Sequence, residues 1–343
     1  MRTPLAWTTA AVRAIHDLTP SIRQFDLETG RTGHFTPGSH LDVSVQVGGR
    51  AEIRSYSIVE AIDGGWRIAV RRADDGRGGS RYLWSLPAGA RLSVSEPKNH
   101  FELNPRASQV LLVAGGIGVT PLVAMARQLA ARGADVRMAY GARSARDFAY
   151  GETLRAALGE RLTLLPQDEG RAIDAAALIA PLAPQAECYV CGPLGLLDAM
   201  RRAWAAAGRP AARLRYETFG NSGRHAPEAF TVKVPRHGIE CVVPVGTSML
   251  EALEQAGVQV LSDCRRGECG LCAVDVLSAQ GTIDHRDVFL SDHEKAAGTK
   301  MCACVSRVVG GSVTIDSAFR GDPDGMPALD AVWRIEAKVA EAG

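Results

Sequence analysis

The chain has 343 residues, too many for one ordinary domain, so two or three are expected. Lysine and arginine total 39 against 38 for aspartate and glutamate, and this net charge of +1 gives no electrostatic case for nucleic acid or an anionic membrane as partner. Eight cysteines follow an N-terminus without the apolar core of an export signal, which favours metal or redox use in the cytoplasm over a disulfide framework.

Residues 1–104 show the pattern of short β-strands separated by turn signals. The clearest strands are Leu41–Val47, Arg54–Val59 and Trp66–Arg71, each bounded by glycines or polar residues. Alternating strands at this spacing predict a small antiparallel β-barrel.

Two motifs in this barrel segment have the chemistry of a flavin site. In RSYS an arginine can pair with a phosphate, a tyrosine can stack on the flavin ring, and a serine can reach its N5 atom. The loop GRGGS can form a backbone nest for the phosphate, with Ser80 capping the helix that follows. A surface arginine with a packed tyrosine, and a flexible hairpin tip, are the plain alternatives. The motif residues are Arg54, Ser55, Tyr56, Ser57, Gly78, Gly79 and Ser80.

Residues 105–222 alternate strands with helices, which predicts a parallel α/β sheet. Strand Val110–Ala114 precedes helix Pro121–Ala131, and strand Cys188–Cys191 precedes helix Leu194–Ala207. The uncharged run 110–126 approaches the length of a membrane span, but its glycines and proline favour a strand, a turn and a helix.

The turn GGIGVTP lies where a pyrophosphate meets a helix N-terminus, although it is neither the GxGxxG nor the Walker A motif. A glycine turn used only for packing is the alternative. The CGP motif ends a later strand of the same predicted sheet, at the edge where ligands of open α/β sheets bind. The residues of the two motifs are Gly115, Gly116, Gly118, Thr120, Pro121, Cys191, Gly192 and Pro193.

A linker is expected at 223–228, followed by a third domain at 229–320 and a tail at 321–343 whose apolar positions share one helical face. The third domain contains Cys264, Cys269 and Cys272 in the spacing C-x4-C-x2-C, the pattern of plant-type [2Fe–2S] proteins. Zinc sites usually use paired C-x2-C halves and fit less well. Spacing leaves the fourth ligand open between Cys302 and Cys304.

The remaining cysteines are not expected to form a disulfide or to hold a metal. Cys188 and Cys191 lie three apart on a strand, so their side chains should point to opposite faces and cannot share a metal. Cys241 lies in an apolar strand and is expected in the core.

The motifs RSYS, GRGGS, GGIGVTP, CGP and CRRGECGLC, in this order, resemble those of the phthalate dioxygenase reductase family, over residues from about 5 to 318. The resemblance implies a flavin barrel, an NAD domain of ferredoxin-reductase type and a β-grasp plant-type ferredoxin domain. It also implies FMN as the usual flavin, with FAD left open as the alternative, together with NADH, a [2Fe–2S] cluster and a terminal Rieske-type oxygenase as protein partner. The matching segments DHRD and CVSR select Cys304 over Cys302 as the fourth ligand.

The resemblance also implies a hydride-transfer pocket shaped by Ser57, Cys191 and Glu217. The loop containing Arg143 and Ser144 is expected to contact the nucleotide, and Arg143 leaves NADPH open beside NADH. A flavin can take a two-electron hydride and release single electrons, which explains three cofactor sites in one chain. The alternative functions are a stand-alone NADH:acceptor reductase acting on a small molecule and a redox sensor without enzymatic turnover.

Overall fold

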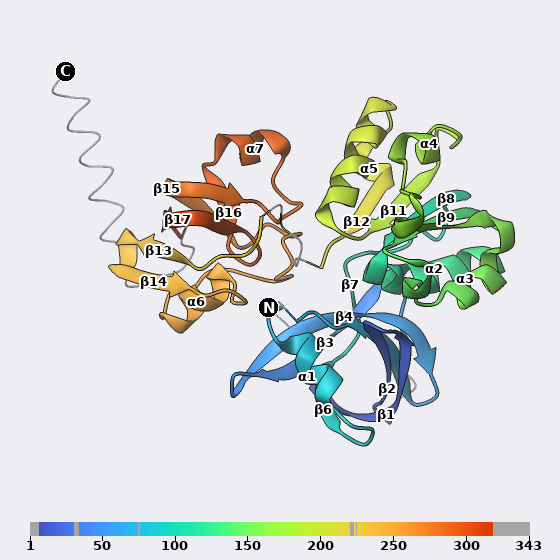
Figure 1. The fold of residues 1–343 in the computed structure, drawn as a ribbon, viewed down its shortest axis with the longest axis horizontal. Helices are drawn as coiled ribbons and strands as arrows, with labels where there is room; N and C mark the ends of the chain where they lie inside the picture. Colours follow the sequence, from blue (N-terminus) through green and yellow to red (C-terminus); the bar gives the residue numbers. More distant parts are fainter. Residues whose placement is uncertain (1–6, 31–33, 75, 220–222, 224, 318–343) are drawn as a thin grey trace. The chain divides into compact units, whose positions relative to one another are not determined.

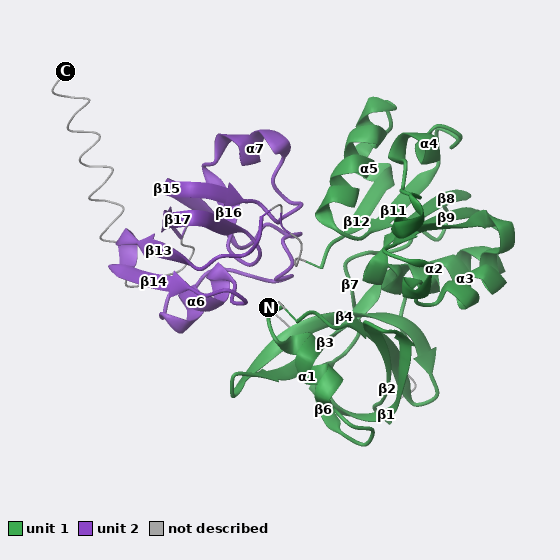
Figure 2. Ribbon diagram, viewed as in Figure 1, with its two compact units in different colours: residues 1–219 green, residues 220–343 purple. Residues whose placement is uncertain are grey.

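The protein is described by a computed structural model covering residues 7–30, 34–74, 76–219, 223 and 225–317. The chain divides into two compact units, residues 1–219 and 220–343, coloured green and purple in Figure 2. The expected amphipathic tail at 321–343 lies outside the described residues.

The first part of unit 1 is an antiparallel barrel, as the sequence predicted. Its sheet has the order β4-β5-β2-β1-β6-β3-β7, and a further pairing of β3 with β4 closes it (Figure 1). Alternate residues of β3 are fully buried with Phe25 and Ile68 in the barrel core, which explains why this period-two pattern folds as a strand. The strands and the helix α1 are β1 (Trp7–Thr19), β2 (Ile22–Glu28), β3 (Ser39–Val47), β4 (Arg50–Ile62), β5 (Gly65–Arg71), α1 (Gly79–Ser85), β6 (Arg91–Ser95) and β7 (Lys98–Asn99).

The second part of unit 1 is a parallel sheet of order β10-β9-β8-β11-β12, which confirms the predicted α/β class. The uncharged run 110–126 forms a strand, a 3-10 turn and the start of a helix. Among the residues that the structure describes, no helix has the length and apolar character needed to span a bilayer. The elements are β8 (Gln109–Gly115), α2 (Thr120–Ala131), β9 (Asp135–Ala142), α3 (Gly151–Leu158), β10 (Leu162–Pro166), α4 (Ala175–Ile179), β11 (Glu187–Cys191), α5 (Leu194–Ala206) and β12 (Leu214–Glu217).

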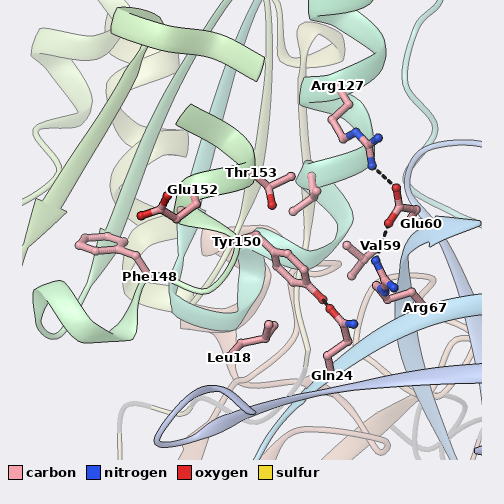
Figure 3. A pocket seen from close by; sticks show the side chains of 12 residues that line it. Leu18, Gln24, Val59, Glu60, Arg67, Arg127, Phe148, Tyr150, Glu152 and Thr153 are labelled. Carbon is pink, nitrogen blue, oxygen red and sulfur yellow. Dashed lines mark hydrogen bonds and ion pairs between the residues drawn. The ribbon is translucent and has the colours of Figure 1, made fainter. Parts of the chain in front are cut away.

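Barrel and parallel sheet share one hydrophobic core, in which Ile22 and Val59 of the barrel pack with Leu122 and Val123 of α2. Beside this core lies a cavity of about 310 Å³ crossed by polar links between the two parts (Figure 3). Glu60 of β4 pairs with Arg127 of α2 and with Arg67 of β5, and the Tyr150 hydroxyl donates to the Gln24 side chain at 3.1 Å. These contacts make residues 7–219 one packed body.

Unit 2 is a mixed sheet of order β14-β13-β17-β15-β16, in which β13 and β17 are parallel, and its β-grasp class agrees with the prediction. A capping box between Ser248 and Glu251 begins α6. Cys241 was expected in the core, but it is only half-buried because β14 is an edge strand. The elements are β13 (Phe230–Val234), β14 (Ile239–Val243), α6 (Met249–Gln255), β15 (Ala273–Asp284), α7 (Asp292–Ala297), β16 (Lys300–Cys302) and β17 (Arg307–Asp316).

One ion pair in the barrel has a defined pH signature. Both oxygens of Asp26 accept hydrogen bonds from Arg67, at 2.7 and 2.8 Å. Burial raises the pKa of Asp26, but the hydrogen bonds and charge of Arg67 outweigh burial, so the pKa lies below its ordinary value. The stability from this pair is therefore present above the unfolded pKa of about 4 and is lost as pH falls through the folded pKa.

We expect Asp26→Asn to lower the free energy of unfolding by about 2 kcal/mol at pH 7. The difference from the unchanged protein should shrink steadily below about pH 4, where the wild-type carboxyl also becomes neutral. Urea denaturation over a series of pH values measures it. A deficit of constant size across that series would contradict the electrostatic origin.

Candidate functional site

The structure brings the RSYS strand and the GRGGS loop together. An Nη2 atom of Arg54 donates to the Arg77 carbonyl at 3.0 Å, and the same guanidinium pairs with Glu52. A Cβ placed on Gly79 would lie 2.6 Å from Cγ of Arg54, so the loop packs directly on the arginine stem. A guanidinium beside a glycine loop can hold a phosphate.

Ser80 does not cap α1, contrary to the expectation from the sequence. The helix begins at Gly79 after Gly78, which has a φ of 80° and gives no side-chain cap. Ser80 is already within the first turn, and its Oγ accepts the Ala73 N–H at 3.1 Å, which fixes the loop from within. The left-handed φ at Gly78, where a Cβ would meet Val47 at 2.8 Å, explains the need for glycine.

The three residues after Arg54 have different environments. Tyr56 packs against the barrel core, and burial raises its pKa although Arg54 and Arg77 oppose the shift. The Ser55 hydroxyl donates to Asp42 at 2.6 Å. Ser57 is buried, and its Oγ has no hydrogen-bond partner within the described part of the chain. A buried hydroxyl without a protein partner is unfavourable by itself and fits a ligand atom, as a flavin ring nitrogen would be.

On the parallel sheet, the predicted nicotinamide motifs meet at the carboxyl edge. Ala114 of β8, Cys191 of β11 and Glu217 of β12 are directly in register across three adjacent strands. Cys191 is completely buried and Glu217 is 1% exposed. This edge is where ligands of open α/β sheets bind.

Close packing explains two glycines of the GGIGVTP turn. A Cβ on Gly118 would lie 2.2 Å from the carbonyl oxygen of Cys191, and one on Gly115 would lie 2.7 Å from Cδ of Pro193. The turn therefore rests on the CGP segment, without space for a side chain at Gly115 or Gly118. Gly192 faces Gly115 in the same contact, with 3.1 Å from its added Cβ to the Gly115 Cα.

The turn contains features that the motif alone did not reveal. A 3-10 turn, Gly116–Val119, separates β8 from α2, and Gly116 has a φ of 54° with open space beside it. Thr120 begins α2, and its hydroxyl donates to the Ile117 carbonyl at 3.0 Å, so its proton is used inside the turn. Pro121 follows within the first helical turn, where a missing N–H costs nothing.

The loop after β9 presents Arg143 at the surface and holds Ser144 internally. Both the backbone N–H and the hydroxyl of Ser144 donate to the Asp147 carboxylate, at 3.1 and 2.7 Å. Asp147 was not among the predicted site residues, although the Ser-x-x-Asp spacing of a capping box signals it in the sequence.

In unit 2 the cysteine loop folds around Cys264. Its Sγ accepts backbone N–H groups from Arg266, Glu268 and Cys269, each at 3.4 Å. Such N–H···S bonds stabilise a thiolate and the added charge of a reduced cluster. The donor chemistry thus fits an iron–sulfur centre.

Two glycines with positive φ shape this loop. Gly267 has a φ of 78°, and a Cβ there would lie 2.6 Å from Val305 and 2.9 Å from the Asp287 Cα. Gly270 has a φ of 73°, and a Cβ there would lie 2.2 Å from the ring of Phe289. Both positions need glycine for conformation and for space.

The side chains of Cys302 and Cys304 both contact Cys272, and these contacts lower the pKa of the Cys272 thiol. Contact with Cys272 and burial raise the pKa of Cys304, whose thiol also faces Cys264 and the Gly267 N–H. Contact with Cys272, burial and the nearby charge of Asp287 also raise the pKa of Cys302, which pairs in register with Ala273. Cys264, Cys272 and Cys304 are therefore brought together around the glycine loop.

No three His, Cys, Asp or Glu side chains among the described residues converge as ligands of a single ion would. A [2Fe–2S] cluster makes a different demand, because two irons each take two thiolates. Away from this loop, Cys188 and Cys191 are buried on β11 and form no disulfide with each other.

Three family descriptions match consecutive stretches of the chain. Residues 9–103 match the oxidoreductase FAD-binding domain, 112–202 the oxidoreductase NAD-binding domain, and 232–309 the 2Fe-2S iron-sulfur cluster binding domain. Together with the barrel, the parallel sheet and the cysteine loop, they define the class: this is a flavin-, NAD- and [2Fe–2S]-dependent oxidoreductase, which confirms the predicted enzyme class.

Similar proteins cover nearly the whole chain. The heme-dependent oxidative N-demethylase beta subunit of Ectopseudomonas mendocina (strain ymp) is 38% identical over 310 residues, which span 89% of this chain and 97% of the relative. The phthalate dioxygenase reductase of Burkholderia cepacia is 36% identical, over 82% of this chain and 88% of the relative.

A solved structure of a phthalate dioxygenase reductase matches with a TM-score of 0.72 at 31% identity, over 91% of this chain and 98% of that chain. The chain belongs to the phthalate dioxygenase reductase family of oxygenase reductase subunits, as its motifs predicted.

Proposed function

We propose that this protein is the reductase component of an oxygenase system, which takes hydride from NADH and delivers single electrons to a separate Rieske-type terminal oxygenase. When bound, the flavin accepts the two-electron hydride and the cluster carries electrons singly. One observation carries the proposal: a single chain contains a barrel loop suited to a phosphate, a sheet edge suited to a nucleotide and a loop that gathers cysteine side chains. We place this activity in the cytoplasm, where free thiols persist.

The chain's own residues supply binding and orientation. We assign the flavin phosphate to Arg54 and the loop at Gly78 and Gly79, with Tyr56 against the ring and the Ser57 hydroxyl offered to a ring nitrogen. Gly115, Gly116 and Gly118 permit a close approach of the nucleotide pyrophosphate to the start of α2. Arg143 is assigned to the nucleotide's adenosine end, with NADH as the preferred donor.

Cys191 and Glu217 end the strands β11 and β12 at the carboxyl edge of the sheet. Both side chains are buried, so they exclude water from the place where the nicotinamide would lie. The cluster is assigned to Cys264, Cys269, Cys272 and Cys304. We also propose that the chain has three domains, with boundaries near residues 104 and 222.

The partner is proposed from the relatives. One relative's name places it in a heme-dependent N-demethylase and another's identifies it as the reductase of a dioxygenase. Both names describe reductases or subunits that work with an oxidising component. Reconstitution with the oxygenase encoded next to this protein's gene, and measurement of NADH-dependent substrate oxidation, tests the assignment. Full substrate turnover without this reductase would overturn it.

We expect the flavin released by denaturing the holoprotein to be FMN. The pairing of Arg54 with the glycine loop suits one terminal phosphate, and the family resemblance implies FMN, whereas the matched domain description does not separate FMN from FAD. Chromatography of the extracted flavin against both standards measures it. Recovery of FAD alone would contradict the expectation.

The proposed electron order is tested under anaerobic conditions. NADH should first bleach the flavin absorbance and then generate the electron paramagnetic resonance (EPR) signal of a reduced [2Fe–2S] cluster. Flavin bleaching without any cluster reduction would favour a stand-alone NADH:acceptor reductase and contradict the relay.

A further inference from the structure

Two segments, DHRD (284–287) and CVSR (304–307), match the family, but apart from the proposed ligand Cys304 their residues have no role in the function proposed above. In the structure their arginines are buried: Arg286 is 6% exposed and Arg307 is 5% exposed. Arg286 Nε donates to Oδ2 of the buried Asp284 at 2.8 Å, and its Nη2 forms an ion pair with the same oxygen at 2.7 Å. A buried charge requires hydrogen-bond partners. The groups that accept hydrogen bonds from the other N–H groups of the two guanidiniums therefore show which part of the chain these segments bind.

Those donors reach the backbone that enters unit 2 before β13. Arg286 donates to the His225 carbonyl at 3.1 Å, and Arg307 donates to the Glu228 carbonyl at 2.9 Å. Arg307 also holds the Thr247 and Pro244 carbonyls, at 2.6 and 2.9 Å. Two buried cations thus face one buried carboxylate and several main-chain oxygens. The carbonyl groups of residues 225 and 228 therefore take the place of water as hydrogen-bond acceptors for the two arginines.

Two further contacts fix the same entry segment. A Cβ on Gly223 would lie 2.3 Å from an Asp284 carboxylate oxygen and 2.4 Å from Nε of Arg286, so the backbone there lies against the ion pair. The Glu228 side chain accepts the Gly310 N–H of β17 at 3.1 Å. The expected linker at 223–228 is therefore held at its described residues by the ferredoxin unit.

The same two segments are tied to the cluster loop. Ser306 donates to Asp287 at 3.2 Å and accepts the Arg286 N–H at 3.3 Å. Val288, which follows Asp287, donates its N–H at 2.9 Å to the carbonyl of Gly267, a residue between the proposed ligands Cys264 and Cys269. One continuous strip from 284 to 288 thus contacts both the entry segment and the cluster loop.

We propose that Asp284, Arg286 and Arg307 form a clamp that fastens Gly223 and residues 225–228 to the ferredoxin unit and so shortens the tether between the flavin unit and the cluster. Phe219 ends unit 1 and Gly223 lies four residues later, so the connecting chain can span at most about 14 Å. If the hold at 223–225 opens, the next fixed point is Glu228, nine residues from Phe219, with a reach of about 32 Å. These three are positioning residues, because they act through the tether.

This inference rests on the proposed function, since a tether matters only if electrons pass from one unit to the other. The effective concentration of tethered groups falls roughly as the −3/2 power of tether length. Lengthening from four to nine residues should therefore slow electron transfer from flavin to cluster by about threefold. Hydride transfer takes place within unit 1 and should keep its rate.

The experiment uses the full holoprotein with Arg286→Gln, Gly223→Val and the control Arg236→Gln. Arg236 also forms a two-bond pair in unit 2, with the partly buried Asp316 at 2.6 and 2.7 Å, but this pair lies outside the clamp. Rapid-mixing absorbance follows flavin reduction by NADH, and freeze-quenched EPR follows the cluster. Limited trypsin digestion at the Arg224–His225 bond measures release of the entry segment without any redox readout.

Both clamp variants should reduce the flavin at the normal rate, reduce the cluster about threefold more slowly, and be cut faster at Arg224–His225. The control should match the unchanged protein in all three. Normal cluster reduction in Gly223→Val overturns the positioning role, even if Arg286→Gln fails to fold. Unchanged cleavage overturns the clamp itself. A failure of the proposed function would appear differently, as absent flavin-to-cluster transfer in the unchanged protein.

Discussion

Replacing Cys304 with serine should lower NADH-driven cytochrome c reduction by more than about 100-fold, beyond the range usual for residues that only support a metal ligand. The matched change Cys302→Ser should leave most of that activity. Both cysteines are buried and stand two residues apart, so the pair separates a ligand from its neighbour within almost the same environment.

The difference follows from what each thiol faces. Cys304 faces Cys264, Cys272 and the Gly267 N–H, all parts of the cysteine loop. Cys302 contacts Cys272 as well, but it lies on the edge strand β16, where the charge of Asp287 adds to the rise of its pKa. Serine keeps the size of cysteine but loses the soft sulfur that iron prefers. Only the change at 304 should therefore cost the cluster.

The measurement combines iron content, the EPR spectrum of the reduced protein and two acceptor assays. Ferricyanide takes electrons from the flavin directly, so its NADH-dependent reduction should survive in both variants. If Cys302→Ser lost the cluster while Cys304→Ser kept it, the ligand assignment would be reversed. Equal loss of both acceptor activities with flavin still bound would instead show that the proposed electron order is wrong.

Short motifs predicted the chemistry of this protein better than its long-range packing. The spacing of Cys264, Cys269 and Cys272 and the strand-turn-helix of GGIGVTP are local features, and the structure shows both in the expected kind of element. Such local features can be predicted from the sequence, because ligand geometry and turn conformation depend on a few adjacent residues.

The features that escaped prediction depend on distant partners. Ser80 was expected to cap α1, yet its hydroxyl serves the Ala73 N–H because the loop closes on itself. The role of the buried pair of Asp284 and Arg286 could not be predicted from the DHRD motif. The carbonyl that accepts a hydrogen bond from Arg286 belongs to the entry segment, 61 residues away in the sequence.

The largest expected effect on the nucleotide side comes from a single methyl group. Gly118→Ala should slow flavin reduction by NADH by about 100-fold, because a displacement of about 1 Å in a site that orients a reaction has that cost. The added Cβ would lie 2.2 Å from the Cys191 carbonyl oxygen and 2.5 Å from its carbon. Backbone atoms of a central strand cannot rotate away as a side chain can, so the glycine turn must move.

The movement would open the contact between the glycine turn and the CGP segment at the level of Cys191 and Glu217, where the nicotinamide is proposed to lie. The barrel is untouched, so flavin content should be normal, and dithionite should reduce both flavin and cluster as in the unchanged protein. Stopped-flow traces of flavin bleaching against NADH concentration separate weaker binding from slower transfer at saturation.

Gly195→Ala is the matched control, since Gly195 lies in α5 just after the CGP segment and no atom stands within 4 Å of its added Cβ. Alanine favours a helix by about 1 kcal/mol over glycine, so this variant should be slightly more stable and reduce its flavin at the normal rate. If Gly118→Ala also reduced its flavin normally, the close packing of turn and strand would have no part in nucleotide binding. The nucleotide would then have to bind away from this edge of the sheet.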